Sequence, residues 1–518
     1  MLTRRKLLKN TGIAALAAVS SDLWIPAARA QASTFDYYIS PTGDDNNPGT
    51  LASPWSITAL NTKMSVYSGK RIGIIGDVGG TQTPIQYGTA GGVQTTLYSI
   101  ANNINSTASG DQCVINVNGG NSSANTYLGS CTSAGVYQAE WAIIDPANPV
   151  GGAVPTGAYA CVIGQWFYQN NNPVANQGYV TFDGLVVRNG NYTGINMGDT
   201  RPGLTGIIIK SCKIYNCTCS TSANNPGGIL VANHTGTQII NCLIYNCTTT
   251  GGSNHPWGMA GITSYSGLGM IVTNCTIYGC GYSIQMKDGN QYGTFSYNYF
   301  DCGNFGSWSN GGQGCFALMA IVPGSGQPPL TVHHNIIIGN GWRSYGEDGL
   351  HTTGAANFYN NTFYANTTGS GGGAVVAAWW SPTSGAGPFQ WDNNLVYYPG
   401  VAGGNNGSWT GALTLNPPTG VIASQVNYNY YGTGMTFGTT SGLSYAAWQA
   451  LGYDVNSVSG GSPFSGTPTA LSINSFQITG PATTAGRGGV ACGALDGSGQ
   501  VGCNFALMPM APVLTTVS

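Results

Sequence analysis

A short apolar motif recurs eight times between residues 183 and 399 and constrains the fold more than any other feature of this sequence. Successive copies start 23 to 37 residues apart, so the motif is constant while its spacing is not. The copies start at Asp183, Ser211, Asn241, Asn274, Tyr297, His334, Asn360 and Asn393. This combination is typical of a solenoid, in which loops of varied length leave a stack of similar coils.

Two columns of the motif indicate which side chains point inward. The second column holds small or amide residues: Gly184, Cys212, Cys242, Cys275, Asn298, Asn335, Asn361 and Asn394. The fourth column is apolar: Val186, Ile214, Ile244, Ile277, Phe300, Ile337, Phe363 and Val396. Alternate side chains of a strand share a face, so both columns should face the interior, where stacked asparagines can hydrogen-bond from coil to coil. The copies are β-branched, aromatic and Asn-rich and lack a 3.6-residue period, which argues against a helical or leucine-rich solenoid.

The first 30 residues read as a removable export signal. Arg4 and Arg5 precede a mildly apolar stretch, and Ala28-Arg29-Ala30 offers a small-x-small cleavage pattern. The paired arginines resemble a bacterial twin-arginine signal, although an ordinary secretory signal is the alternative. Either route predicts a periplasmic or extracellular protein. No later apolar run reaches the roughly 18 residues that a spanning helix needs, so we expect no membrane insertion of the mature chain.

Charge and cysteine content narrow the class further. Removing the signal leaves 10 basic and 16 acidic residues, a formal charge of −6, which disfavours nucleic acid as a partner. Hydrophobic residues make up 42% of the chain and charged residues only 6%, and this composition is not that of a disordered protein. Cysteine pairs five residues apart recur inside strand-like segments, so we expect most thiols to be buried and unpaired. Cys492 and Cys503 in the loop-rich tail are the better disulfide candidates.

Four segments carry a family resemblance. Residues 36–50 with Pro54-Trp55 resemble the opening of secreted proteins of the pectate-lyase-like superfamily, and residues 179–185 are similar to a strand of their first coil. Residues 427–431 and 443–457 resemble their closing segment. The resemblance implies an all-β fold: a right-handed parallel β-helix over residues 31–400 with a β-rich C-terminal segment, 401–518, packed on it. Members are mostly polysaccharide lyases and glycoside hydrolases, with some non-catalytic surface proteins. The Gly-His-Gly and Arg-Ile-Lys of polygalacturonases and the Trp-Ile-Asp-His of classical pectate lyases are absent from this sequence.

A second strand-like segment in each coil predicts where a polysaccharide would lie. If its aliphatic residues (Ile195, Ile229, Ile262, Ile284 and Leu350) point inward, Asn196, Thr263, Gln285 and His351 point outward. The next outward column holds Tyr265, Lys287 and Thr353. One outward side chain per coil would form a flat ledge on which a sugar chain can lie. We expect Asn196, Gln285 and Tyr265 to bind it, together with Trp379 and Trp380, whose rings can stack on sugars or cap a hydrophobic end.

Lys287 is the main catalytic candidate because it interrupts an apolar strand on this face. A β-elimination needs a base for the C5 proton of a uronic acid, and a lysine with a lowered pKa can supply it. The alternative is a solvated lysine paired with Asp288 or Asp301. One column at the strand ends, where stacked oxygens could bind Ca²⁺, holds Asp199, Asn233, Ser266 and Asp288, although such residues are more often turn residues. No organic cofactor is expected.

A charged cluster of Arg343, Asp348 and His351 completes the candidate set. His351 suits proton transfer, and Asp348 could join Asp288 from a neighbouring coil as the carboxylate pair of a glycoside hydrolase. An ion pair that braces a loop is the alternative. The sequence thus favours a lyase acting on a uronic-acid polymer, with a hydrolase or a non-catalytic carbohydrate-binding protein left open.

Overall fold

The computed structural model divides the chain into two units, Met1–Thr34 and Phe35–Ser518. The fold described here belongs to the second unit. The described residues are 34–86, 112–145, 160–165, 178–190, 192–198, 203–219, 227–249, 259–287, 290–301, 316–318, 328–339, 345–346, 356–365, 376–378, 389–397, 413–415, 423–435, 437, 443–469 and 471–495. No helix among them is long and apolar enough to cross a membrane.

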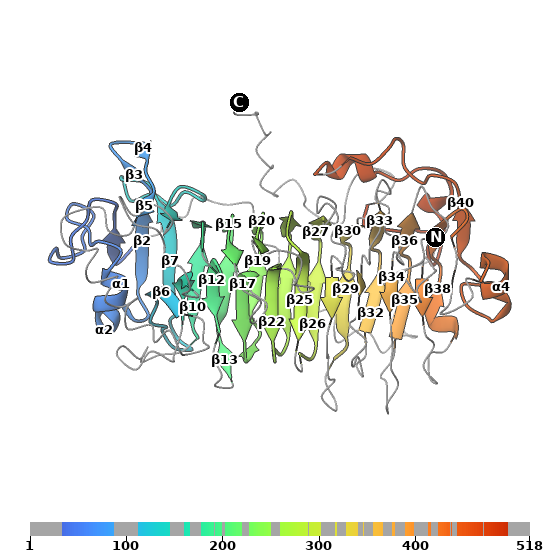
Figure 1. Cartoon of the computed structure of the whole chain (residues 1–518), viewed down its shortest axis with the longest axis horizontal. Helices are drawn as coiled ribbons and strands as arrows, with labels where there is room; N and C mark the ends of the chain where they lie inside the picture. Colours follow the sequence, from blue (N-terminus) through green and yellow to red (C-terminus); the bar gives the residue numbers. More distant parts are fainter. Residues whose placement is uncertain are drawn as a thin grey trace, which may run out of the picture. The chain divides into compact units, whose positions relative to one another are not determined.

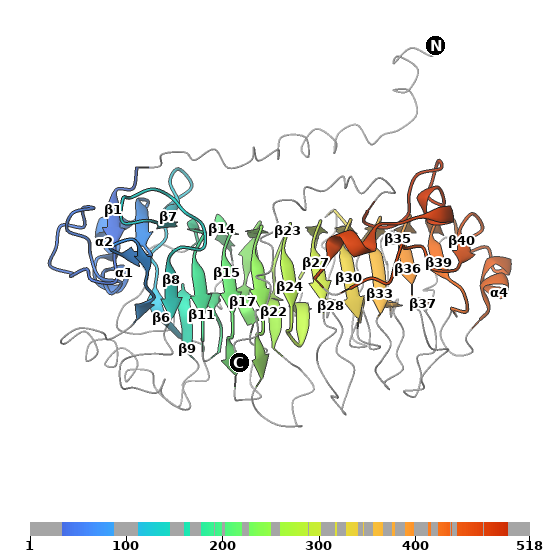
Figure 2. The same cartoon turned by 90° about the horizontal axis from the view of Figure 1, so that it is seen from above.

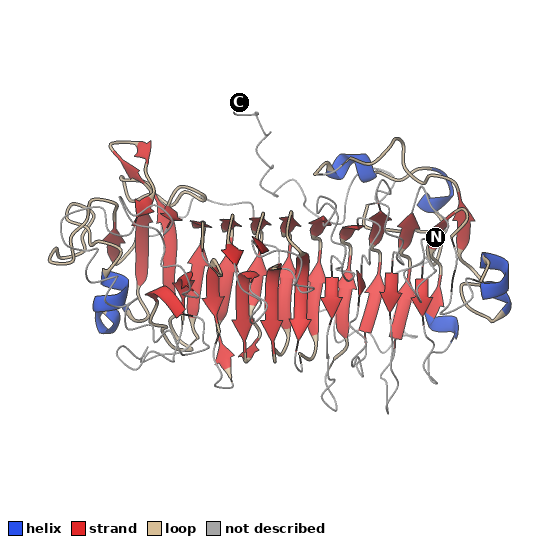
Figure 3. Cartoon of the chain, in the orientation of Figure 1, coloured by secondary structure: helices blue, strands red, loops and turns tan. Residues whose placement is uncertain are grey.

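Three parallel sheets, here called A, B and C, run through the second unit (Figures 1 and 3). Sheet A contains β1 (Tyr37–Ile39), β2 (Arg71–Ile75), β7 (Thr126–Cys131), β10 (Val180–Asp183), β14 (Ile207–Lys210), β19 (Gln238–Ile240), β23 (Met270–Thr273), β26 (Gly293–Ser296), β29 (Leu330–His333), β32 (Ala356–Tyr359), β35 (Phe389–Asp392) and β38 (Val426–Asn427). Sheet B contains β5 (Ile85–Gln86), β8 (Ile143–Asp145), β11 (Val186–Arg188), β15 (Lys213–Tyr215), β20 (Leu243–Tyr245), β24 (Thr276–Tyr278), β27 (Tyr299–Asp301), β30 (Ile336–Gly339), β33 (Thr362–Ala365), β36 (Leu395–Tyr397), β39 (Tyr430–Gly432) and β40 (Val458–Gly460). Sheet C contains β6 (Gln112–Asn116), β9 (Ala160–Gly164), β12 (Ile195–Met197), β17 (Gly227–Ala232), β22 (Ala260–Tyr265), β25 (Tyr282–Lys287), β28 (Phe316–Leu318), β31 (Tyr345–Gly346), β34 (Val376–Ala378) and β37 (Leu413–Leu415).

The order of strands along the chain makes each coil of a helix. The chain passes from a strand of sheet A to one of B and then one of C before it starts the next coil, and neighbouring coils pair in parallel, as β10 does with β14 and β11 with β15. Three short pairs lie outside the main sheets: β3 (Asp77–Val78) with β4 (Thr81–Gln82), β13 (Leu204–Thr205) with β18 (His234–Thr235), and β16 (Thr218–Cys219) with β21 (Thr248–Thr249). The predicted all-β parallel β-helix is confirmed.

The recurrent motif marks the turn from sheet A to sheet B. One residue in each of these turns has a left-handed backbone with φ between 51° and 68°: Gly184, Ser211, Asn241, Asn274, Tyr297, His334, Asn360, Asn393 and Tyr428. Asparagine and glycine tolerate this conformation better than other residues, which explains why Asn is the commonest first residue of the copies. His334 occupies this column with φ 55°, so its position at the turn gives it a structural role.

The register of the first copy was predicted one residue too early. Val187, not Val186, pairs with Ile214, and Gly184 takes the left-handed position that Ser211 holds in the next coil. Leu185 therefore stands in the second column. Asp183 is instead the last residue of β10, where it pairs with Lys210.

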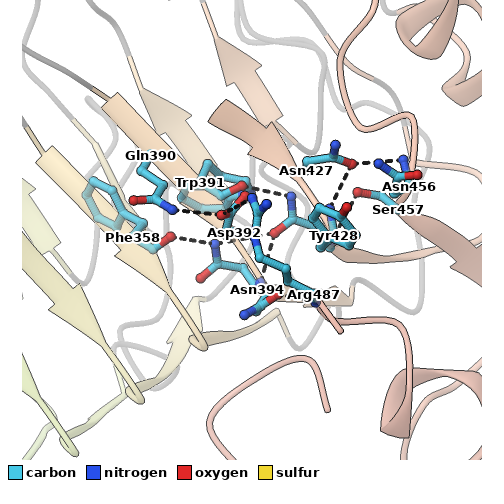
Figure 4. A network of polar contacts seen from close by, with 12 residues as sticks. Phe358, Gln390, Trp391, Asp392, Asn394, Asn427, Tyr428, Asn456, Ser457 and Arg487 are labelled. Atoms are coloured by element: carbon cyan, nitrogen blue, oxygen red, sulfur yellow. Dashed lines mark hydrogen bonds and ion pairs between the residues drawn. The ribbon is translucent and has the colours of Figure 1, made fainter. Parts of the chain in front are cut away.

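The second column forms a continuous polar ladder inside the β-helix. The side-chain amide of each asparagine donates to the next one: Asn298 to Asn335 (2.9 Å), Asn335 to Asn361 (2.9 Å), Asn361 to Asn394 (3.0 Å) and Asn394 to Asn429 (3.4 Å). All five are fully buried. Each also uses its amide for a main-chain carbonyl of sheet A, such as Phe358 O for Asn394 (Figure 4). The predicted hydrogen bonding from coil to coil is confirmed.

Acidic and hydroxyl groups terminate the ladder at its C-terminal end. Asn429 donates to Asp454 Oδ1 (2.8 Å), and its main-chain N–H donates to Ser457 Oγ (2.7 Å). Asp454 also accepts hydrogen bonds from Trp448 and Tyr431. Burial raises the pKa of Asp454 to about 6, an effect that these donors oppose.

In earlier coils the same column holds Cys212, Cys242 and Cys275, which are buried free thiols. Burial raises the pKa of Cys212 and Cys242 well above the usual value, so these thiols stay protonated and unreactive. The expectation of buried thiols is thus confirmed for the cysteines with described side chains. Cys492 is also free, and its Sγ donates to the Tyr428 carbonyl (3.2 Å), so the proposed disulfide does not form here; Cys503 lies outside the described residues.

Different segments cover the first coil and the outer face of sheet B. The helices α1 (Ala59–Thr62) and α2 (Met64–Tyr67) lie beside the first strands, where Asn61 accepts a hydrogen bond from Asn116 N. Near the other end are α4 (Tyr445–Ala450) and the 3₁₀ turns η2 (Ala423–Gln425), η3 (Ile473–Phe476) and η4 (Gly480–Thr483). Phe464, Phe476 and Ile478 form one apolar cluster with side chains of sheet B. Figure 2 shows this segment along β30 to β40.

An ion pair ties the same segment to sheet A. Arg487 Nη2 lies 2.6 Å from Asp392 Oδ2, and its guanidinium lies over the Tyr428 ring (Figure 4). Gln390 donates to the same carboxylate oxygen at 2.7 Å. The segment after β40 therefore packs on two sheets rather than extending the stack.

Replacing one amide in the middle of the ladder should test its contribution to stability. Asn361→Ala removes hydrogen bonds to two neighbouring coils and leaves buried groups unpaired, so we expect the free energy of unfolding to fall by about 2–5 kcal/mol. Asn361→Cys introduces the residue that earlier coils use in this column and should cost less. Urea unfolding measures both. Equal losses for the two variants would contradict the equivalence of cysteine and asparagine here.

Three described histidines predict that the fold loses stability in acid. Burial lowers the pKa of His234 to about 4 and of His334 to about 4, and burial with the neighbouring His334 lowers the pKa of His333 to about 3. An unfolded histidine has a pKa of about 6.5, so the unfolded state binds more protons between these values. Stability is therefore fully present above pH 6.5 and lost as the pH falls toward 4, by about 3 kcal/mol for His234. Asp454 works in the opposite direction because its folded pKa is raised.

Urea midpoints measured between pH 7.5 and 4.5 check this expectation. His234→Gln keeps a hydrogen-bonding group without the titration, so its midpoint should change less with pH than that of the wild type. A wild-type midpoint that stays constant over this range would contradict the assignment.

Candidate functional site

The main catalytic and stacking candidates lie at or after three of four adjacent strands of sheet C. Strands β25, β28, β31 and β34 are consecutive neighbours in this sheet, and they run parallel. Lys287 is the last residue of β25, Asp348 follows two residues after β31, and Trp379 directly follows β34. The carboxyl ends of parallel strands lie at one edge of a sheet, so the segments with these residues start from the same edge. We call it the C-terminal edge of sheet C.

Only part of the predicted site falls on described residues. Asp199, Asp288, Arg343, Asp348, His351, Trp379 and Trp380 lie outside them. The backbone of Lys287 is described as the last residue of β25, where it pairs with Tyr265 of β22. The two residues are therefore neighbours in the column that was predicted to point outward. Tyr265 is half-buried and packs against the main apolar core.

The predicted open ledge is wrong for the described residues. Asn196, Thr263 and Gln285 lie in one column, as predicted, with Leu230 between Asn196 and Thr263, but all three polar side chains are fully buried. Asn196 Nδ2 donates to Cys161 Sγ at 3.1 Å. Alternation directs a side chain away from the core but does not decide whether other segments cover it, which is why the exposure was mispredicted.

The structure has one more strand at this edge than the sequence predicted. The sequence placed Leu350 and His351 in the strand after β25, but β28 comes first, and the strand of the following coil is Tyr345-Gly346. Gly346 pairs with Ala317, and Ala317 pairs with Gln285. Gly346 therefore occupies the position in the column of Gln285 that was predicted for His351. Asp288 and Asp348 therefore follow strands separated by β28, not strands of neighbouring coils.

A buried polar network holds the chain on the far side of the turn after Lys287. Asn290 Oδ1 accepts from Ser264 Oγ (2.7 Å) and Gly267 N (2.9 Å), and its Nδ2 donates to Ser264 O (2.9 Å). His234 Nε2 completes the network at 3.0 Å from Ser264 Oγ. Because Ser264 donates to Asn290, His234 must donate through Nε2, leaving the Nδ1 lone pair buried. Sequence analysis missed this network, since its members are 26 and 30 residues apart and follow no motif.

The described part of the proposed metal set consists of turn residues. Asn233 has φ +50° and Ser266 has φ +48°, directly after the paired residues Ala232 and Tyr265. A left-handed turn at the same point of each coil favours such residues, so backbone conformation alone explains why Asn233 and Ser266 fall in one column. Within the described ranges no three His, Cys, Asp or Glu side chains are grouped to hold a metal ion.

A second polar cluster lies on sheet A, and sequence reasoning missed it as well. Asp183 accepts hydrogen bonds from the Tyr127 and Tyr137 hydroxyls, both at 2.7 Å, and pairs with Lys210 at 3.1 Å. Burial and the Asp183 charge raise the pKa of both phenols. They remain protonated donors and are poor bases, so the cluster fits a clamp between coils better than a catalytic centre.

Comparison with known proteins supports the fold. Residues 173–368 match the family model described as the right handed beta helix region. No curated protein matches the sequence. Among solved structures, similar ones include the pectate lyase Pel9A (15% identity, 69% of this chain and 74% of that chain, TM-score 0.44) and a rhamnogalacturonan lyase (16% identity, 71% and 83%, TM-score 0.41). A structure of XylC with xylose shares 12% identity over 77% and 84% of the chains, with a TM-score of 0.38.

Similarities at these levels do not bear on substrate or reaction. The parallel pairing of the three sheets and the family model agree on the architecture, and the chain is a right-handed parallel β-helix protein.

Proposed function

We propose that this protein is an exported polysaccharide lyase that cleaves a uronic-acid-containing polymer by β-elimination at the C-terminal edge of sheet C. The observation that carries the proposal is the meeting of strand ends there: Lys287 ends β25, Asp348 and His351 follow β31, and Trp379 follows β34, while Arg343 lies two residues before β31.

Lys287 acts as the base in this proposal. Its neutral amine takes the C5 proton of the uronic acid, the electron pair forms the C4–C5 double bond, and the C4–O bond breaks. The departing oxygen receives a proton from the lysine ammonium or from His351. Arg343 holds the carboxylate, whose negative charge increases as the C5 proton leaves. Trp379 and Trp380 supply ring faces for neighbouring sugars.

Ca²⁺ is the metal that would assist this chemistry: oxygen atoms from the set Asp199, Asn233 and Asp288 would hold it, and its positive charge would stabilise the substrate carboxylate. The described member, Asn233, fits its role as a left-handed turn residue without a metal. The requirement for Ca²⁺ is therefore tested separately from the base.

Absorbance at 235 nm detects the unsaturated product of β-elimination. We expect it to rise when the protein is incubated with polygalacturonate, alginate, glucuronan or chondroitin, and Lys287→Ala to lower kcat by about 10²–10⁴-fold because the general base is lost. Lys70→Ala, which removes an exposed lysine close to β2, is the matched control and should leave the rate unchanged. An EDTA arm with Ca²⁺ restored tests the metal.

Two outcomes would overturn the proposal. New reducing ends without absorbance at 235 nm would indicate hydrolysis, with Asp288 and Asp348 as the carboxylate pair. Binding of the polymers without either signal would indicate a non-catalytic carbohydrate-binding protein.

A further inference from the structure

Gln285 is a buried amide without a hydrogen-bond partner. It lies in the middle of β25, between Ile284 and Met286, which both belong to the main apolar core. Its side chain is fully buried, and neither Oε1 nor Nε2 has a partner. Leaving such groups unpaired costs about 1–3 kcal/mol, so an amide that persists at such a position needs an explanation.

Gln165 shows that this β-helix can satisfy a buried glutamine. It directly follows β9 of the same sheet and is also fully buried. Its Oε1 accepts from Gly178 N at 2.8 Å, and its Nε2 donates to Gly178 O at 3.2 Å. A structural glutamine therefore pairs both amide atoms with the main chain, whereas Gln285 pairs neither.

The position of Gln285 directs it toward the candidate site. Alternation along β25 places Gln285 on the side away from Ile284 and Met286, and the strand ends two residues later at Lys287. Thr263 and Ala317 are its neighbours in the column, and neither is charged. The unpaired amide thus lies one step along the strand from the residue to which we assign the base.

We propose that the Gln285 amide binds a pair of adjacent free hydroxyl groups on a sugar of the substrate, and so selects polymers that are not O-acetylated there. The proposal rests on the proposed function, in that the C-terminal edge of sheet C handles a polysaccharide. A carboxamide offers one acceptor and one donor in a single plane. One sugar hydroxyl donates to Oε1 while its neighbour accepts from Nε2. Acetylation of the first hydroxyl removes the donor and adds bulk.

Opposite effects on stability and on binding distinguish this role from a structural one. Gln285→Met replaces an unpaired amide by an apolar chain of similar length, so we expect Tm to rise by a few degrees while binding of the polymer weakens at least about tenfold. Gln165→Met is the matched control, and it should lower Tm because it breaks two buried hydrogen bonds. Differential scanning calorimetry and isothermal titration with polygalacturonate and alginate oligosaccharides measure both quantities.

The acetylation state of the polymer provides the second arm. Wild-type protein should bind de-O-acetylated polygalacturonate more tightly than its O-acetylated form, and Gln285→Met should reduce that preference. A lower Tm for Gln285→Met, undiminished binding by this variant, or equal binding of both polymers by the wild type would each overturn the inference. Wild-type binding without cleavage, with these effects retained, would overturn only the proposed lyase activity. Failure of the wild type to bind any of the oligosaccharides would overturn both.

Discussion

The turn from sheet A to sheet B is the constraint on which the rest of the structure depends. In nine successive coils, from Gly184 to Tyr428, one residue adopts a left-handed conformation, and the next side chain enters the interior. Between Asn298 and Asn429 that side chain is an amide, bonded to the coils on either side. Loops can differ in length without shifting the register because the coils are aligned at this turn. The motif can therefore recur at variable spacing in the sequence while the strands stack in a constant register in the structure.

The ladder changes chemistry along its length, and each change has a physical reason. Asn298 is the first amide, and its Oδ1 accepts from the main-chain N–H of Cys275. Before it, thiols fill the column: Cys275 and Cys242 are small, weak hydrogen-bonding groups that suit an apolar interior. At the far end Asp454 supplies only acceptors, which suits a position that receives four donors from Asn429, Ser457, Trp448 and Tyr431. An asparagine there would place its side-chain NH₂ group against at least one of these donors, and two donors cannot form a hydrogen bond.

Most of the fold was predictable from sequence because the motif marks a backbone conformation as well as a buried position. Asn241, Asn274 and Asn360 mark left-handed turns directly. The first copy was misaligned because Gly184 fits both the small column and the left-handed one. The exposure of Asn196 and Gln285 was not predictable, since strand alternation determines a direction and not what covers the side chain. The extra strand β28 was missed because Phe316–Leu318 is short and carries no motif. The network of His234, Ser264 and Asn290 joins residues that only the coiling brings together.

The burial of the thiols bears on how such a chain reaches its destination. The buried thiols of successive coils stack on one another: Cys212, Cys242 and Cys275. Burial raises the pKa of Cys212 and Cys242, which keeps these two thiols protonated. While the chain is unfolded these thiols are accessible, and in an oxidising compartment they would pair with one another in several ways. Once the coils have closed, none can reach an oxidant without opening the β-helix. We propose that the chain folds in a reducing compartment before export, which is the order that a twin-arginine signal would impose. The burial of these thiols in the folded interior supports that order of events.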